Sequence, residues 1–463
     1  MYRSRARVYN GAAARYGFKA LIDRTLVLFA GLRTRRQNTI TSKGEQAVND
    51  PSRSKRVLAT GLIGNVLEWY DFAVYGFFAT IIAGHFFPAD NPTTSLIAAF
   101  GAFAAGFLMR PIGAIVFGRI GDTFGRRRML FLSVMLMAIP TFLIGILPTH
   151  EQIGIMAAVL IVLLRMLQGL SVGGEYTGSI VYLIEQAPRE KRALYASFSM
   201  MGATIGIMLG SGVGALISSL LTAEQLQSWG WRVPFLLGIS IGALGFVIRR
   251  GLPESPSGQT EPTPLKNLFF DYRRQMLQSI GLNTMGAVCF YLIFVYLVTW
   301  IVDEVHETQS TALQINTLSL LVLLIATPAM ATLSDRFGRR PMLLAGSLAM
   351  AFGAYPLILL MHHEDFWLIL AGESLFALIL ATFMGSIPSF MAELFPTSIR
   401  ATATSVSYNI PYAIFGGTAP MVAVWLIAVT DNADVIAAYL VMVSLIAFAI
   451  ALRVNDRTGQ ALH

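Results

Sequence analysis

Long apolar runs dominate this sequence, and many of them contain 18 or more residues. One helix of that length is enough to cross the hydrocarbon core of a lipid bilayer. Only 13% of the 463 residues are charged, whereas soluble domains carry about 25%. We therefore expect an all-α polytopic membrane protein rather than two or three soluble cores.

The apolar runs predict twelve transmembrane helices. Their approximate ranges are 57–86, 95–118, 129–148, 153–184, 193–221, 232–250, 276–302, 312–333, 341–361, 367–391, 401–428 and 434–453. The hydrophilic stretch 251–275, rich in Pro, Ser and Thr, divides them into six-helix halves at 57–250 and 276–453. A short tail, 454–463, follows the last helix.

The positive charge of the chain lies in residues 1–56, which hold 13 Lys+Arg and 3 Asp+Glu. The remaining residues hold 21 and 23, so the helical part is not expected to bind nucleic acid. The segment 1–56 is interpreted as a disordered cytoplasmic tail. A membrane-surface segment, an overlong start and an organelle presequence are the alternatives.

Charges in the loops predict an orientation. Lys and Arg cluster in every second connection, from Arg119 and Arg126–Arg128 to Arg400, and acidic residues occupy the opposite connections, with Arg232 as the exception. By the positive-inside rule, both termini are then cytoplasmic. One cysteine, Cys289, excludes a disulfide framework, and no metal site is expected.

The chain also repeats itself. Gly121–Arg127 (GDTFGRR) returns as Ser334–Arg340 (SDRFGRR), 213 residues later, and Glu185 and Arg192 return as Glu393 and Arg400, 208 residues later. Two matches at nearly one offset indicate two related halves in parallel orientation. Repeats of this kind are typical of alternating-access carriers, whose substrate site lies between the halves.

The segment Gly118–Arg127 (GRIGDTFGRR) resembles the loop signature of the major facilitator superfamily, with Thr123 where Arg is commonest. Four further stretches resemble its metabolite:proton symporter branch. They are Gly64–Phe72 (GNVLEWYDF), Gly106–Gly113 (GFLMRPIG), Gln168–Tyr176 (QGLSVGGEY) and Trp229–Phe235 (WGWRVPF). The resemblance, over about residues 55–455, implies a bacterial inner-membrane carrier for 2-oxoglutarate, citrate, shikimate, proline or betaines.

Ionisable residues inside a membrane helix are costly and are functional candidates by default. Asp71 with Arg165 is the predicted proton-coupling pair, as in related symporters, and Glu68 or Glu175 is a second proton site. A carboxylate beside an arginine keeps a low pKa, which rises when the arginine turns to the substrate. A static ion pair that fixes helix packing is the alternative.

Arg110 is the predicted anchor for a substrate carboxylate, because a guanidinium binds carboxylate through two parallel hydrogen bonds. A structural arginine is the alternative. The other predicted substrate-binding residues are Tyr75, Gln168, Tyr176, Asn283, Tyr291, Tyr408, Asn409 and Tyr412, for which helix packing is equally compatible.

The repeated loops are interpreted as gating elements, in which Asp122 and Asp335 contact the dipole and arginines of a neighbouring helix. Glu185 with Arg192, and Glu393 with Arg400, are expected to serve the same latch. The whole predicted set is Asp122, Gly125, Arg126, Arg127, Glu185, Arg192, Asp335, Gly338, Arg339, Arg340, Glu393 and Arg400.

The resulting prediction is a monomeric symporter in the lipid bilayer that imports a small organic acid or zwitterion. It has no cofactor other than protons as the coupling ion. An exporter or antiporter of the same fold and a non-transporting membrane sensor remain as alternatives. An enzyme is not expected, since no nucleophile–base set, phosphate loop or metal cluster is present.

Overall fold

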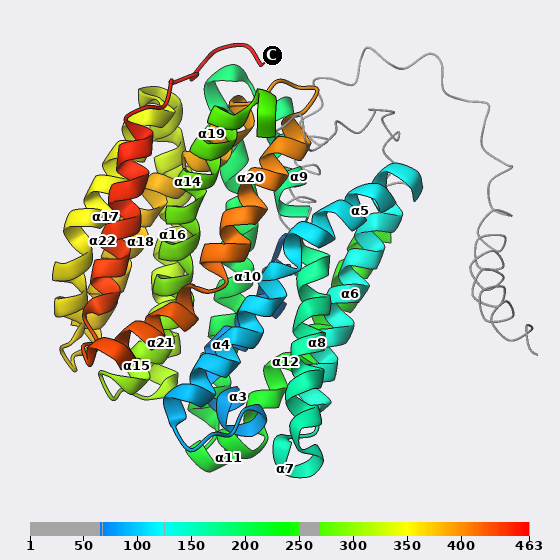
Figure 1. The fold of residues 1–463 in the computed structure, drawn as a ribbon, viewed down its shortest axis with the longest axis vertical. Helices are drawn as coiled ribbons and strands as arrows, with labels where there is room; N and C mark the ends of the chain where they lie inside the picture. Colours follow the sequence, from blue (N-terminus) through cyan, green and yellow to red (C-terminus); the bar gives the residue numbers. More distant parts are fainter. Residues whose placement is uncertain (1–64, 67, 125, 174, 251–268, 463) are drawn as a thin grey trace, which may run out of the picture. The chain divides into compact units, whose positions relative to one another are not determined.

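The computed structural model describes residues 65–66, 68–124, 126–173, 175–250 and 269–462. Across these ranges the secondary structure is helical, and no strand occurs (Figure 1). The predicted segment 1–56 and most of the predicted linker lie outside the described residues.

The N-terminal half begins with helical residues 65–66 and 68–77. Its further helices are α3 (Ala79–Phe86), α4 (Pro92–Leu108), α5 (Arg110–Phe124), α6 (Arg126–Ile146), α7 (His150–Ile153), α8 (Ile155–Val172), α9 (Glu175–Gln186), η1 (Arg189–Lys191), α10 (Arg192–Leu220), α11 (Ala223–Ser228), η2 (Gly230–Arg232) and α12 (Val233–Arg250).

The C-terminal half follows the same plan. Its helices are α14 (Arg273–Tyr291), η3 (Leu292–Tyr296), α15 (Leu297–Asp303), α16 (Gln309–Phe337), α17 (Arg339–Met361), α18 (Phe366–Met384), α19 (Ile387–Glu393), α20 (Arg400–Pro411), η4 (Tyr412–Gly416), α21 (Ala419–Thr430) and α22 (Val435–Ala451).

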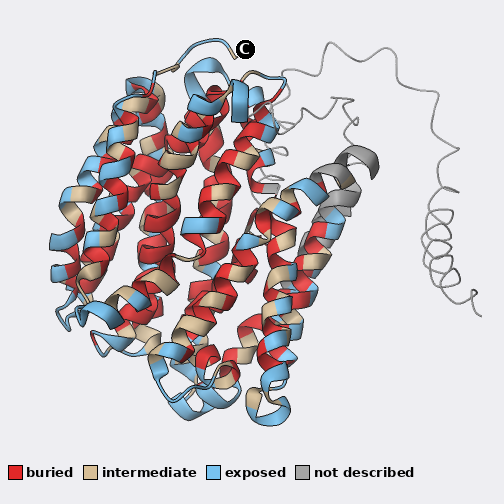
Figure 2. Cartoon of the chain, viewed as in Figure 1, coloured by how far each residue is buried: buried red, intermediate tan, exposed pale blue. Residues whose placement is uncertain are grey.

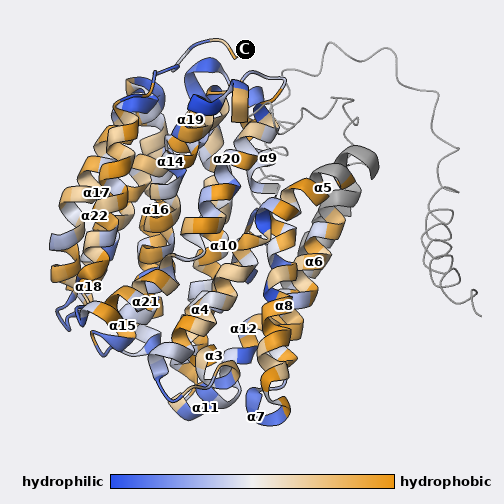
Figure 3. Cartoon of the chain, in the orientation of Figure 1, coloured by the Kyte–Doolittle hydropathy of each residue, from blue (hydrophilic) through white to orange (hydrophobic). Residues whose placement is uncertain are grey.

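Eight helical stretches in the described residues are long and apolar enough to cross a membrane, and two shorter apolar helices, Phe131–Ile146 and Val435–Ala451, accompany them. The other two expected spans, 57–86 and 232–250, include residues or side chains outside the described set. The helices carry large apolar side chains on their outer faces, such as Ile155, Phe352 and Trp367 (Figures 2 and 3). Such faces suit lipid rather than water.

The bundle has two chemically different ends. The end where α10, α17 and α20 begin carries Arg192, Arg339 and Arg400, and we call it the basic side. The opposite end, with α7, α11 and the 304–308 loop, carries acidic residues and we call it the acidic side (Figure 1). Arg232 lies at the acidic side, where it donates to the carbonyl oxygens of Gly145 and Leu147 at the end of α6.

Helices α4 and α5 approach α8 closely because glycines line the contact. A Cβ on Gly169 would overlap the Gly106 carbonyl oxygen, and a Cβ on Gly113 would overlap that of Leu170. A Cβ on Gly173 would overlap the backbone at Arg110. Small residues allow this approach of membrane helices, and here they bring Arg110 against the C-terminal end of α8.

Gly169→Ala should therefore lower the thermal stability of the detergent-purified protein. The added methyl group has backbone rather than a flexible side chain in its way, and overpacking of this kind costs about 1–3 kcal/mol. The matched control is Gly178→Ala on α9, where a Cβ meets nothing within 4 Å. That variant should be neutral or slightly stabilising, because alanine favours helix. Equal thermal unfolding midpoints for the two variants would contradict the packing argument.

Candidate functional site

The predicted site residues Asp71, Arg110 and Arg165 lie deep inside the bundle. Asp71 is 2% exposed, Arg110 1% and Arg165 0%. They come from the first helix, the start of α5 and the middle of α8. Since burial of unpaired charge is expensive, their surroundings decide what they can do.

Aromatic rings surround the Arg110 guanidinium. Its central carbon lies 5.4 Å from the ring centre of Trp69 and 5.1 Å from that of Phe107. The rings of Tyr408 and Tyr412 are each 5.8 Å away. Cation–π attraction makes the charge tolerable here. None of its three nitrogens makes a well-aligned hydrogen bond to the described residues, although the Tyr291 hydroxyl lies near enough to interact with it, so the fork that binds carboxylates is largely open.

Both halves build this aromatic cluster. Tyr176 from the first half packs 4.9 Å from Tyr408 of the second half, centre to centre, and Tyr408 stacks on Tyr412 at 4.0 Å. Phe107 meets Tyr291 at 4.9 Å. Among the residues predicted to bind substrate, Arg110, Tyr176, Tyr291, Tyr408 and Tyr412 are therefore brought together.

The remaining predicted binding residues contact other groups. Asn409 donates to the Gly173 carbonyl at 2.7 Å, across the two halves, and Asn283 donates to the Ser279 carbonyl at 2.8 Å. The Tyr75 hydroxyl donates to the Ala99 carbonyl at 3.0 Å. Gln168 lies between two side chains, as described next.

The predicted coupling pair is bridged rather than in direct contact. Arg165 Nη1 donates to Gln168 Oε1 at 2.8 Å, and Gln168 Nε2 donates to Thr141 Oγ1 at 2.7 Å. Thr141, from α6, also lies beside the Asp71 carboxyl, close enough to interact with it. Asp71 Oδ1, Arg165 Nε and Arg165 Nη2 have no partner among the described residues. The guanidinium lies over the rings of Phe72 and Tyr75, at 4.2 and 4.4 Å from their centres.

Glu68 and Glu175 are the two candidates for a second proton site. Glu68 is buried and is close enough to Arg110 to interact electrostatically with it. The side chain of Glu175 lies outside the described set, as do those of Asp122, Arg126 and Arg127 and the whole of Gly125.

Sequence reasoning missed four residues. Trp69 and Phe107 lie inside the motifs that carry the family resemblance, next to Glu68 and near Arg110, but aromatic residues in a membrane helix look like ordinary packing. Thr141 has no signal beyond one hydroxyl in an apolar run. Glu373 did have one, because it is the only charged residue within α18. It is fully buried, and neither carboxyl oxygen has a partner among the described residues, so buried charge-bearing groups are not confined to the first half.

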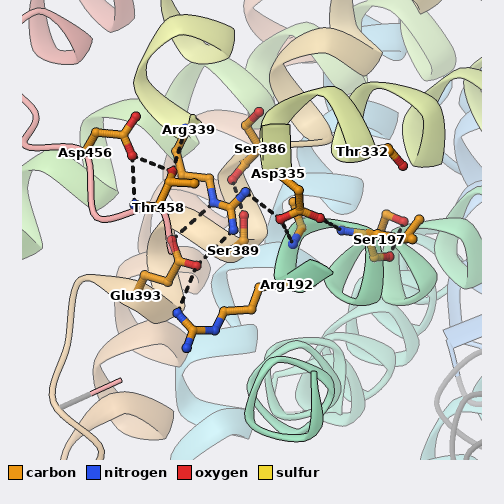
Figure 4. Close-up of polar contacts among 12 residues, drawn as sticks. Arg192, Ser197, Thr332, Asp335, Arg339, Ser386, Ser389, Glu393, Asp456 and Thr458 are labelled. Carbon is orange, nitrogen blue, oxygen red and sulfur yellow. Dashed lines mark hydrogen bonds and ion pairs between the residues drawn. The ribbon is translucent and has the colours of Figure 1, made fainter. Parts of the chain in front are cut away.

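On the basic side, a polar network joins the halves (Figure 4). Asp335, at the end of α16, accepts hydrogen bonds from the backbone N–H groups of Ala193 and Leu194, both at 2.9 Å. Those groups begin α10, so the carboxylate lies at the positive end of that helix dipole. Arg339 donates to Asp335 at 2.7 Å and to both carboxylate oxygens of Glu393, at 3.0 and 3.2 Å.

The glutamate–arginine pairs of the two repeats exchange partners. Glu185 pairs with Arg400 at 2.9 Å, and Glu393 pairs with Arg192 at 3.6 Å. The sequence leads us to expect Glu185 with Arg192 and Glu393 with Arg400. The structure corrects this expectation, and the symmetry of the repeats explains the exchange. The end of α9 faces the start of α20, and the end of α19 faces the start of α10, so each repeat supplies half of each pair. Arg400 also donates to the Ala392 carbonyl at 2.9 Å.

Residues 453–462, which we call the strap, cross the basic side. Asp456 Oδ2 accepts from the Arg340 N–H and Thr458 Oγ1 from the Arg339 N–H, both at 3.1 Å, after Gly338 turns with φ +105°. The strap's Gln460 carbonyl accepts from Arg192 of the other half at 2.8 Å. It is thus attached to both halves.

Hydrogen bonding sets the charge of the strap's aspartate. Partial burial raises the pKa of Asp456, but bonds from Thr458 and from the Arg340 and Arg339 N–H groups outweigh it and lower the pKa. A lowered pKa means that the ionised group stabilises the folded state. This stabilisation is fully present above the ordinary aspartate pKa and is lost only as the pH falls through the lowered pKa. Asp456 therefore stays ionised near neutral pH.

The halves also meet on the acidic side. Gln309 Nε2 donates to the Phe77 carbonyl at 2.7 Å, and Ser211 of α10 bonds Asn316 and Thr317 of α16, at 3.1 and 2.9 Å. Arg110 and Arg165 therefore lie between two contacts that join the halves. Among the described residues, the two halves are therefore in contact on both sides of the buried polar centre.

A family profile described as sugar (and other) transporter matches the chain twice, over residues 57–260 and 257–462. The chain is 34% identical over 429 residues to the glycine betaine/proline/ectoine/pipecolic acid transporter OusA of Dickeya dadantii, covering 89% of this chain and 85% of the relative. It is 33% identical over 447 residues to the proline/betaine transporter of Escherichia coli K12, covering 93% and 89%.

Among solved structures, a D-xylose-proton symporter superposes with a TM-score of 0.70 at 20% identity, over 88% of this chain and all of that one. The partially occluded inward-open xylose transporter XylE of E. coli gives 0.66, also at 20% identity, over 89% of this chain and 100% of that one. These likenesses show the fold of two six-helix halves. The chain belongs to the sugar (and other) transporter family within the major facilitator superfamily, and it is a multi-pass membrane transporter rather than an enzyme.

Proposed function

We propose that this transporter imports a small zwitterion, with a carboxylate and a cationic nitrogen, together with protons. The observation that carries the proposal is Arg110, whose guanidinium lies among aromatic rings supplied by both halves and makes no well-aligned hydrogen bond to the described residues. The fork suits a carboxylate, and the surrounding ring faces suit an alkylated cation. The betaine and proline named for the relatives have this chemistry.

Proton coupling is assigned to Asp71 and Arg165. The carboxyl reaches the arginine through Thr141 and Gln168, so a change in one is felt by the other. Glu68, beside Arg110, is the second proton site. No cofactor beyond the proton is required. We place the chain as a monomer in a bacterial inner membrane, with the basic side cytoplasmic by the positive-inside rule.

Alternating access then follows from the contacts between the halves. The Asp335–α10 contact and the exchanged glutamate–arginine pairs close the basic side, and the α10–α16 contact closes the acidic side. Opening toward the cytoplasm requires the first set to break, and opening outward requires the second to part.

The proposal is tested by uptake of labelled glycine betaine and proline into cells or proteoliposomes, at an inward proton gradient, with and without a protonophore. We expect accumulation that collapses when the protonophore is added. An exporter would instead lower the internal concentration, and accumulation that ignores the protonophore would contradict proton symport. Membranes without the protein supply the background.

A further inference from the structure

Thr141 occupies the junction of three helices. Thr141 lies on α6. Its hydroxyl accepts a hydrogen bond from Gln168 on α8, and its side chain lies beside the Asp71 carboxyl of the first helix. On α12, a Cβ at Gly238 would lie 2.7 Å from Thr141 Cγ2 and 2.8 Å from Asp71 Oδ1. Glycine at 238 therefore leaves room for the threonine and the carboxyl to meet. Thr141, Gln168 and Arg165 are all fully buried.

The Thr141 hydroxyl has more partners than it can serve in one orientation. A hydroxyl offers one proton and two lone pairs. One lone pair accepts from Gln168 Nε2 at 2.7 Å. The single proton goes to the Met137 carbonyl at 2.9 Å, on the same helix, and the neighbouring Asp71 carboxylate is the alternative acceptor.

We propose that Thr141 is a positioning residue for proton coupling, whose hydroxyl rotates between Met137 and Asp71 and links the protonation of Asp71 to Arg165 through Gln168. The inference rests on the proposed proton symport and deepens it.

Every hydrogen bond balances in both states. With Asp71 ionised, the hydroxyl donates to the carboxylate and accepts from Gln168. With Asp71 protonated, the carboxylic O–H donates to the second lone pair of Thr141, and the hydroxyl proton turns to the Met137 carbonyl. No proton is left without an acceptor in either state, so Asp71 can change charge in a buried site without leaving an unsatisfied group.

Few other charges act on this junction. Arg165 on α8 interacts electrostatically with Asp71, as does Tyr70 on its own helix, and Tyr75 faces Arg165. Glu68 interacts with the Arg110 cluster instead. The described side chains of α6, of α12 and of α4 add no ionisable group, and α10 adds none near its middle.

The test compares three variants in proteoliposomes over a range of pH. Thr141→Val keeps the shape but removes the hydroxyl, and Thr141→Ser keeps the hydroxyl. The matched control is Thr204→Val, since Thr204 is also fully buried and its hydroxyl donates only to the Met200 carbonyl four residues earlier. Initial uptake, steady-state accumulation and substrate exchange are measured for each.

Loss of a donor to the carboxylate favours protonated Asp71. Thr141→Val should therefore shift the pH of half-maximal uptake upward, by about one pH unit, and lower accumulation more than exchange. Thr141→Ser should restore the wild-type profile, and Thr204→Val should leave it unchanged. If Thr141→Val does not fold, Gln168→Leu, which breaks the link to Arg165, should also change the pH profile.

Three results would overturn the inference. They are an unshifted profile in Thr141→Val, the same shift in Thr204→Val, and no restoration by Thr141→Ser. Failure of the proposed symport is a separate result, because it would appear as protonophore-insensitive uptake in the unsubstituted protein.

Discussion

Asp71→Asn should abolish concentrative uptake while leaving exchange of substrate across the membrane. Asparagine keeps the size of the side chain and a hydrogen-bonding group toward Thr141, so the helices should still pack. It cannot take up a proton, so the substrate gradient is no longer tied to the membrane potential. One proton carried across 100 mV is worth about 2.3 kcal/mol, so accumulation should fall by roughly 50-fold per 100 mV.

The measurement is the ratio of internal to external substrate at steady state, beside counterflow exchange in the same vesicles. Asp90→Asn, on the exposed acidic side, is the control and should accumulate substrate normally. Full accumulation by Asp71→Asn would remove Asp71 from the coupling mechanism. Loss of both accumulation and exchange, with normal folding, would point to substrate binding instead.

Arg110→Lys should raise the KM for zwitterions by roughly 10- to 100-fold, with a smaller effect on the maximal rate. Lysine keeps the charge but loses the planar fork, and a charged hydrogen bond contributes about 1.5–3 kcal/mol. The aromatic rings would still hold a cation, so folding should survive. Arg189→Lys, exposed on the basic side, should behave as the unsubstituted protein.

A competitor without a carboxylate distinguishes the two roles open to Arg110. Choline keeps the alkylated cation of glycine betaine and lacks its carboxylate. In the unsubstituted protein, betaine should compete far better than choline for uptake of labelled betaine. In Arg110→Lys that preference should shrink. An unchanged KM and an unchanged preference would make Arg110 a structural arginine.

Much of the fold follows from the sequence because bilayer thickness fixes the length of apolar runs. The repeats also predict the halves, and the contact between Asp335 and a helix end follows from the helix dipole. The spacing of residues along the sequence does not reveal which faces of two helices are in contact. Glu185 and Glu393 exchange arginine partners only when the two halves pack together. The sequence of one repeat holds no information on that packing.

The candidate site shows the same limit. Depth along a helix placed Asp71 and Arg165 at one level, but the rotation of each helix decides that Gln168 and Thr141 lie between them. Two π-helical segments lie at the site: η3 begins directly after Tyr291, and η4 begins with Tyr412. No residue pattern predicts them. Glu373 is different. The cost of a carboxyl group in an apolar helix is a signal that could have identified it, although it is not among the residues predicted from the sequence.

The strap has a practical consequence for work with this transporter. Its Gln460 carbonyl bonds Arg192, and Leu462 packs against the apolar core of the bundle, so anything joined after residue 462 begins at the junction of the two halves. An affinity tag or fluorescent fusion attached there would disturb the contacts of the basic side, which must break for release of substrate into the cytoplasm. Kinetic comparisons should therefore be made on protein whose tag has been cleaved or moved to the other terminus.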